Sequence, residues 1–229
     1  FRPNFTKFSK EQWKGVIFYG ISTGAMNLLF YYGIQRVPLG IGVSVEFVGP
    51  LGVALLASRR KLDFLWAFLA LTGILLLVPW KAQENSVDLI GLLFVIAAGI
   101  FWALYIVAGS KIANKIASTD AVACGMWIAT LVVMPCAIGC GRLPVLTWKL
   151  GLVGLAVAIL CSALPFTLEL LAMKKIPAKT FSILTSLDPG IAALSGMIFL
   201  KEHLTITQCM AIACIVAASF GATASSPER

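Results

Sequence analysis

The stretch VPLGIGVSVEFVGPLGVAL, residues 37–55, is apolar or small almost throughout, with one acid, Glu46, and one proline, Pro50, near its middle. A helix of about 20 such residues rises about 1.5 Å per residue and so crosses the ~30 Å hydrocarbon core of a bilayer. Runs of this kind recur near residues 13–34, 39–58, 64–80, 88–110, 119–139, 149–172, 178–200 and 205–224. The pattern predicts an all-α, polytopic membrane bundle of about eight transmembrane helices joined by short connections.

Composition supports a membrane environment. Hydrophobic residues make up 59% of the chain and charged residues 12%, whereas about 25% of the residues of a soluble domain are charged. The net charge is +8, but the basic residues lie between the apolar runs and form no stripe interleaved with aromatic residues. We therefore expect the lipid bilayer as a partner and no nucleic acid.

The distribution of Lys and Arg predicts the orientation of the chain. If successive helices alternate in direction, 13 of the 18 basic residues fall on the side that holds both chain ends. Cytoplasmic loops carry such an excess of positive charge. We therefore expect both termini in the cytoplasm.

The proline positions indicate an internal repeat. Pro38 and Pro177 each open a predicted helix and lie 139 residues apart (177 − 38), and Pro50 and Pro189 have the same offset (189 − 50). A chance spacing is the alternative. Equivalent helices are five apart in chain order, an odd number, so the two copies would enter the membrane in opposite directions, as in many secondary transporters.

The repeat predicts the domain organisation. Residues 1–87 would form an incomplete first copy of three helices that lacks its first two, and residues 88–229 a complete copy of five. We expect a parent protein of about ten helices built as an inverted repeat. A genomic reading frame that begins at or just before Phe1 would refute this expectation.

Three carboxylates lie within the apolar runs. We place Glu46 and Asp188 near helix centres and Glu169 nearer the cytoplasmic end of its helix. An ionised acid at mid-membrane costs about 2.5–3.5 kcal/mol on insertion scales, so such a group is a candidate for reversible protonation or for binding a cation. The alternative is a permanently protonated acid that only links helices by hydrogen bonds.

Two predicted helices contain a Gly-Pro or Pro-Gly break near the middle, at Gly49-Pro50 and at Pro189-Gly190. Proline lacks an N–H, so each break frees the carbonyl four residues earlier, which belongs to Glu46 in one copy and to Thr185 in the other. Interrupted helices at matching places in inverted halves point to a midplane binding site. Kinks that serve only packing remain the alternative.

Further groups could line such a site. Gly42, Glu46, Gly49 and Val53 share one helix face, where the small residues would let a neighbouring backbone approach closely. Trp102 and Tyr105 could wall a cavity. The neutral polar residues inside the apolar runs, each of which could instead only link helices, are Asn27, Ser110, Thr180, Ser182, Thr185 and Ser186.

Enzyme, cofactor and metal signatures are not found in the sequence. It contains no P-loop, no His-Glu-x-x-His and no Gly-x-Ser-x-Gly motif, so we expect no catalysis and no cofactor. Cys136 and Cys140 have helical spacing but no nearby His or carboxylate, which argues against a metal site. The single histidine, His203, is interpreted as a loop residue.

Residues 37–55 together with SALPFTLELLA (162–172) and LDPGIAALSGMIFLKEHLTITQ (187–208) resemble the EamA branch of the drug/metabolite transporter superfamily. The resemblance extends over essentially the whole chain and is closest to the bacterial threonine/homoserine exporters of that branch. It implies ten helices in two inverted halves, a central cavity, and export of small amino acids across the bacterial inner membrane, with protons as the counter-ion. The motif residues that match are Glu46, Pro50, Glu169, Asp188, Pro189 and Glu202; we interpret Glu202 as structural.

The sequence departs from this resemblance at two positions. Asp188 stands where relatives commonly have a longer acid or an amide, and Lys201 stands where glycine is common. The leading hypothesis is an alternating-access exporter of threonine-like amino acids in exchange for protons. Export of another metabolite or a lipophilic cation, or a receptor or scaffold without a transport cycle, are the alternatives. The sequence leaves substrate, stoichiometry and oligomeric state open.

Overall fold

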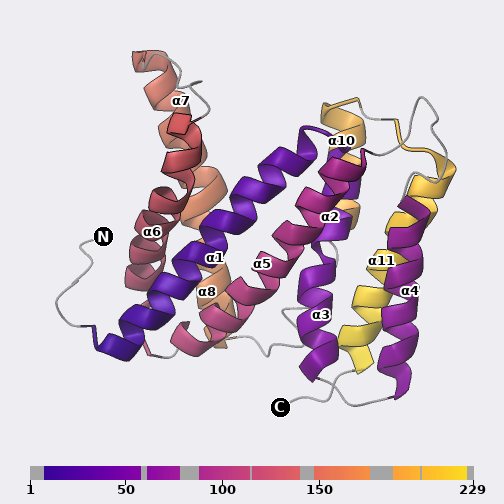
Figure 1. Cartoon of the computed structure of the whole chain (residues 1–229), viewed down its shortest axis with the longest axis horizontal. Helices are drawn as coiled ribbons and strands as arrows, with labels where there is room; N and C mark the ends of the chain where they lie inside the picture. The colour runs from indigo at the N-terminus through magenta and orange to yellow at the C-terminus, as the bar shows by residue number, and fades with distance from the viewer. Residues whose placement is uncertain are drawn as a thin grey trace. The chain divides into compact units, whose positions relative to one another are not determined.

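The structure is a computed structural model that describes residues 8–57, 61–77, 88–113, 115–139, 147–175, 188–201 and 203–225. All regular structure in these ranges is helical. The elements are α1 (Lys10–Ile34), α2 (Leu39–Glu46), α3 (Val48–Ala57), α4 (Lys61–Leu77), α5 (Leu89–Ala113), α6 (Ser118–Gly139), α7 (Trp148–Ala158), the π-helix η2 (Ile159–Ala163), α8 (Leu164–Lys175), α10 (Asp188–Phe199) and α11 (Ile206–Ser225) (Figure 1). The all-α prediction is confirmed for the described part of the chain.

Several helices begin where the sequence supplies a cap. The Ser9 hydroxyl accepts a hydrogen bond from the Gln12 N–H, and the Gln12 side chain accepts one from the Ser9 N–H. Thr205 and Gln208 form the same reciprocal pair at the start of α11, and this arrangement satisfies N–H groups that have no partner within a helix. The two helices that these caps precede, α1 and α11, start at Lys10 and Ile206, close to the predicted boundaries at 13 and 205.

The chain folds into two compact units, which we describe separately. The first comprises Phe1–Ala25 and Leu104–Ile176, and the second comprises Met26–Ala103 and Pro177–Arg229. The first unit therefore holds the beginning of α1, the end of α5, and α6 to α8. The remaining helices belong to the second unit, and α1 and α5 contribute to both.

In the second unit, α4 packs along α11, and α2 packs on α10 (Figure 1). Glycines permit this closeness: a Cβ on Gly73 would lie 2.8 Å from the Ala211 carbonyl oxygen, and one on Gly40 would lie 2.6 Å from the Ala193 Cα. A buried apolar cluster between α2, α5 and α11 consists of Val37, Ile41, Val45, Leu92, Val95, Ala211 and Ile215.

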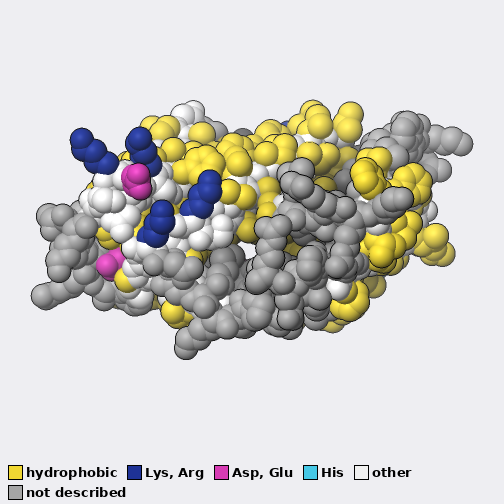
Figure 2. Space-filling model, turned by 90° about the horizontal axis from the view of Figure 1, so that it is seen from below, with side chains coloured by type: hydrophobic (Ala, Val, Ile, Leu, Met, Phe, Trp, Pro, Cys, Tyr) yellow, Lys and Arg dark blue, Asp and Glu magenta, His cyan; other side chains and the backbone are white. Residues whose placement is uncertain are grey.

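The surface is that of a membrane protein. Large apolar side chains are strongly exposed on several helices; for example, Phe64 and Trp148 are each 80% exposed. Hydrophobic side chains cover most of the coloured surface in Figure 2, while the Lys and Arg side chains in that view gather in one area. Contiguous apolar surface of this extent is unfavourable in water but normal against lipid.

Three described helical segments are long and apolar enough to cross a membrane: Leu89–Ala113, Ser118–Gly139 and Trp148–Ala172. α1 is also 25 residues long but carries several polar residues. Its Tyr19, Ser22 and Thr23 are buried, whereas Ile17 and Phe18 are more than 40% exposed. A helix with polar groups inside and apolar groups outside suits a lipid environment, so its composition agrees with a membrane location.

The structure changes one predicted helix. The run predicted at 149–172 is divided into α7, η2 and α8. Pro165 lacks the N–H that would bond to the Cys161 carbonyl, and its ring crowds that carbonyl, so the helix widens in the turn before the proline. The proline was visible in the sequence, but proline alone does not determine whether a helix kinks or widens.

Lys201, one of the two departures noted in the sequence, has a backbone conformation that glycine adopts more easily. It follows α10 with a φ of 55°, a left-handed backbone conformation that costs an L-residue roughly 1–2 kcal/mol and that glycine adopts freely. A glycine at this position, as in the resembling family, would relieve that cost.

Candidate functional site

In the second unit one residue, Phe47, interrupts the helix just before Gly49-Pro50. α2 ends at Glu46, and α3 starts at Val48. The Phe47 N–H still donates to the Val43 oxygen, and the Phe47 oxygen accepts from the Leu51 N–H. The Glu46 carbonyl has no such helical partner, because Pro50 has no N–H to donate.

The Glu46 side chain is buried at this break. It is 7% exposed, and among the described residues its carboxylate makes no hydrogen bond or ion pair. An isolated charge in such a place is expensive, since neither water nor a counter-ion compensates it. A carboxylate in this setting would gain from taking up a proton or a cation.

The break lies directly against α5. A Cβ on Gly99 would lie 2.7 Å from the Glu46 carbonyl oxygen, and a Cβ on Gly49 would overlap the Gly99 carbonyl oxygen. The ring of Phe47 meets Trp102 edge to face, with centroids 5.5 Å apart. We call Glu46, Phe47, Gly49, Gly99 and Trp102 the Glu46 cluster. The close approach predicted for Gly49 is confirmed, whereas Gly42 faces the side chains of neighbouring residues.

A second polar cluster lies in the first unit. The Tyr105 hydroxyl donates to Glu169 Oε2 over 3.0 Å, and the rings of Tyr105 and Tyr19 are 5.0 Å apart. Tyr19 is fully buried, and its hydroxyl makes no hydrogen bond to any described residue. We call Tyr19, Tyr105 and Glu169 the Tyr–Glu cluster.

Tyr19 was missed in the sequence analysis. Gly125 makes room for it, since a Cβ there would lie 2.6 Å from the Tyr19 ring. The available signal was its spacing, because Tyr19, Thr23 and Asn27 recur every four residues and so share one face of α1.

The other predicted site residues have varied surroundings. Asn27 in α1 is partly buried, and Asp188, the first residue of α10, is exposed beside the buried Pro189. Trp102 and Tyr105, which the sequence suggested could wall a cavity, belong to the Glu46 cluster and to the Tyr–Glu cluster, respectively. Ser110 is exposed and donates to the Val107 carbonyl. The predictions that lie outside the described residues concern Thr180, Ser182, Thr185, Ser186 and Glu202.

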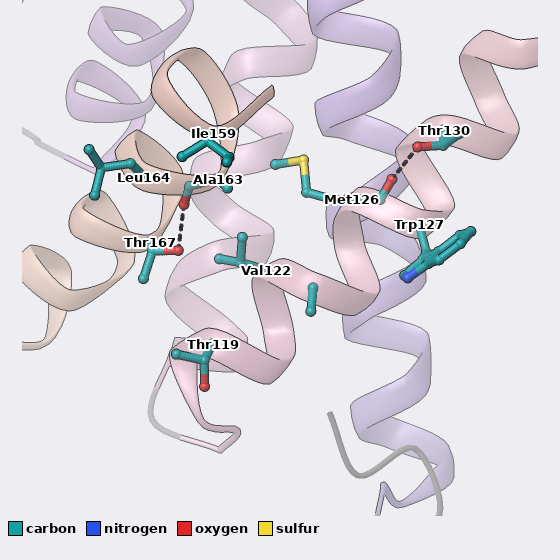
Figure 3. A pocket seen from close by; sticks show the side chains of 10 residues that line it. Thr119, Val122, Met126, Trp127, Thr130, Ile159, Ala163, Leu164 and Thr167 are labelled. Atoms are coloured by element: carbon teal, nitrogen blue, oxygen red, sulfur yellow. Dashed lines mark hydrogen bonds between the residues drawn. The ribbon is translucent and has the colours of Figure 1, made fainter. Parts of the chain in front are cut away.

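The described residues contain no group of three or more His, Cys, Asp or Glu side chains that could hold a metal ion. They do contain a cavity of about 630 Å³ between α6 and η2–α8 in the first unit (Figure 3). Its wall is mainly apolar. The Thr130 hydroxyl donates to the Met126 carbonyl within α6, and the Thr167 hydroxyl of α8 donates to the Ala163 carbonyl of η2 (Figure 3).

The helical architecture, lipid-compatible surface and buried acid at a helix break are features of a membrane transporter. The chain belongs to the EamA-like transporter family, whose profile matches residues 89–224. The resemblance seen in the sequence is thereby confirmed.

The similarity extends to individual exporters. The chain is 46% identical over 224 residues to the threonine/homoserine exporter RhtA of Escherichia coli K12. The aligned residues cover 97% of this chain and 75% of that protein. It is 44% identical over 223 residues to RhtA of Salmonella typhimurium SL1344, with the same coverage. One solved crystal structure shares the fold, with a TM-score of 0.61 and 18% identity over 91% of this chain and 75% of the other. The chain is therefore that of a bacterial membrane exporter.

Proposed function

We propose that the protein, in its full-length form, exports threonine, homoserine and similar small neutral amino acids from the cytoplasm in exchange for protons. The observation that carries the proposal is the lone buried carboxylate of Glu46 at an interrupted helix. The high identity to threonine/homoserine exporters supports the substrate class.

Glu46 would bind the substrate ammonium group or a proton, but not both. The neighbouring backbone carbonyl, which lacks a helical donor, is a second acceptor for an ammonium group. Competition for one carboxylate couples the two flows, because a proton arriving from outside displaces the amino acid, and a cytoplasmic amino acid displaces the proton. Alternating access would expose the acid to one side at a time.

Asp188 and Thr185 would contribute to the same site from the second repeat. Asp188 directly precedes Pro189 as Gly49 directly precedes Pro50, and Thr185 corresponds to Glu46 under the repeat offset. Helices that are equivalent under the repeat also pack on each other in the second unit, α2 with α10 and α4 with α11. This pairing supports a two-fold relation between the copies, with both termini in the cytoplasm and about ten helices in all.

Transport by the full-length protein in proteoliposomes tests the proposal. Radiolabelled threonine or homoserine supplied outside inverted vesicles, where the cytoplasmic face is exposed, should accumulate in the lumen only when an imposed proton gradient drives protons out of the lumen. A lipophilic cation serves as the comparison substrate. Transport of that cation with no amino-acid flux would favour another exporter function, and no flux of either would favour a receptor or scaffold.

The Tyr–Glu cluster gives a paired prediction. Tyr105→Phe removes the donor to Glu169 and should lower the free energy of unfolding by about 1–2 kcal/mol. Tyr19→Phe removes a buried hydroxyl that lacks a good partner and should leave stability unchanged or raise it. Thermal unfolding of the two purified variants measures the contrast, and equal effects would contradict the assigned geometry.

A further inference from the structure

The segment α7–η2–α8 is less buried by the rest of the protein than the other long apolar helices are. Of the most apolar 18-residue window within Trp148–Ala172, 6% is buried, compared with 33% for the corresponding window of Leu89–Ala113 and 28% for that of Ser118–Gly139. A Cβ placed on Gly151 or Gly154 would meet nothing within 4 Å. Exposed apolar positions can face lipid or another helix. The residues at these positions indicate which of the two covers this segment.

The repeat offset of 139 residues relates this segment to α1. Under it Gly15 corresponds to Gly154 (154 − 15 = 139), and Gly24 corresponds to Ala163 (163 − 24 = 139). Both pairs consist of small residues. These two matches are independent of the proline positions from which the offset was obtained.

Gly15, Gly20 and Gly24 of α1 each lie in close contact with a neighbouring helix. A Cβ on Gly15 would lie 2.6 Å from the Ile112 side chain of α5, and a Cβ on Gly24 would lie 2.9 Å from the Ala129 backbone of α6. A Cβ on Gly20 would lie 2.7 Å from the Gly125 oxygen of α6. In the first copy these positions are therefore the contact face for two helices, α5 and α6, which are the first two helices of the second copy.

The equivalent positions in the second copy face empty space. Gly154 has no neighbour, and Ala163 and Ile159, the counterpart of Gly20, line the 630 Å³ cavity beside α6 (Figure 3). Trp127 of α6 lines the same cavity and is 68% exposed. A helix packed against the opening of this cavity, with its side chains filling the cavity, would cover all three side chains.

We propose that Gly154, Ile159, Ala163 and the adjoining cavity form the docking surface for two transmembrane helices of the first repeat, the counterparts of α5 and α6. A two-fold relation between the two copies requires this contact. If the third helix of the first copy packs on the first two helices of the second copy, then the third helix of the second copy must pack on the first two helices of the first copy. The RhtA relatives have room for these helices, since the chain matches 75% of their length. Gly154 receives the counterpart of α5, and Ala163 receives the counterpart of α6.

The same offset identifies positions that should remain in lipid. Ile21 and Phe18 of α1 are 41% and 44% exposed, and their counterparts Leu160 and Val157 are 63% and 50% exposed. All of these positions on α7–η2–α8 are open in the present structure. The proposal therefore predicts which of these exposed residues contact a docked helix and which contact lipid, although all of them are exposed in the structure.

Spin labels on the full-length protein in lipid vesicles test this separation. Single cysteines at positions 154, 163, 157 and 160 are introduced into a cysteine-free background, and oxygen accessibility is measured by EPR. Labels on Gly154→Cys and Ala163→Cys should be several-fold less accessible than labels on Val157→Cys and Leu160→Cys. Equal, high accessibility at all four positions means that lipid alone covers this face and overturns the proposal.

Substitution by leucine provides a second measurement if a labelled variant folds poorly. Gly154→Leu should strongly lower the thermal stability of the full-length protein, because the docked helix leaves no space for the side chain. Val157→Leu, on the lipid-facing side, should have little effect. A stability of Gly154→Leu equal to that of Val157→Leu overturns the proposal. Neither measurement depends on transport, so a failed transport assay would not affect the outcome.

Discussion

Glu46→Gln in the full-length protein is expected to lower threonine and homoserine efflux by at least about tenfold, which corresponds to about 1.4 kcal/mol. The substitution keeps the shape of the side chain and removes its ability to carry a negative charge. Glutamine can neither release a proton nor balance a substrate ammonium group. Because Glu46 is buried without a charged partner among the described residues, its neutral replacement should also be compatible with folding.

The matched control is Glu11→Gln, the same chemical change at an exposed residue in the first turn of α1. This variant should export normally. Efflux of loaded radiolabelled amino acid is measured for both variants at equal amounts of membrane-inserted protein. Near-normal export by Glu46→Gln would remove Glu46 from the transport mechanism.

Gly49→Ala is expected to give the largest loss of stability among single-methyl changes in the second unit. The added Cβ would overlap the Gly99 carbonyl oxygen, which is backbone and cannot rotate away. α3 and α5 would have to separate, and overpacking of this kind typically costs about 1–3 kcal/mol or more. The separation would also disturb Glu46, whose carbonyl lies against Gly99.

Gly52→Ala is the control on the same helix. A Cβ on Gly52 would meet nothing within 4 Å, so only helix propensity changes, and that favours alanine by about 0.5–1 kcal/mol. Thermal unfolding of the two variants in detergent should therefore show shifts of opposite sign. Equal melting temperatures would show that α3 does not approach α5 as closely as described.

The sequence alone predicted much of the local structure. Apolar runs located the helices, because the bilayer sets their length and leaves few alternatives for an unpaired backbone. The proline at position 50 predicted a break near the middle of its helix, since a missing N–H has a local consequence. Motif residues also indicated the transporter family before any comparison was made.

Other features could not be predicted because they depend on contacts between distant segments. The burial of Tyr19 depends on Gly125, 106 residues later (125 − 19), and the approach to Glu46 depends on Gly99. Neither glycine carries a local signal of its partner.

The sequence by itself determined that the chain is a helical membrane protein with acids and helix breaks in its apolar runs, because hydropathy and proline act over a few residues. Only the tertiary structure decided which acid is buried, which glycines join backbones and which face of α7–η2–α8 lacks partners. Those properties depend on distances of a few ångströms between residues far apart in the chain, and no local pattern encodes such distances.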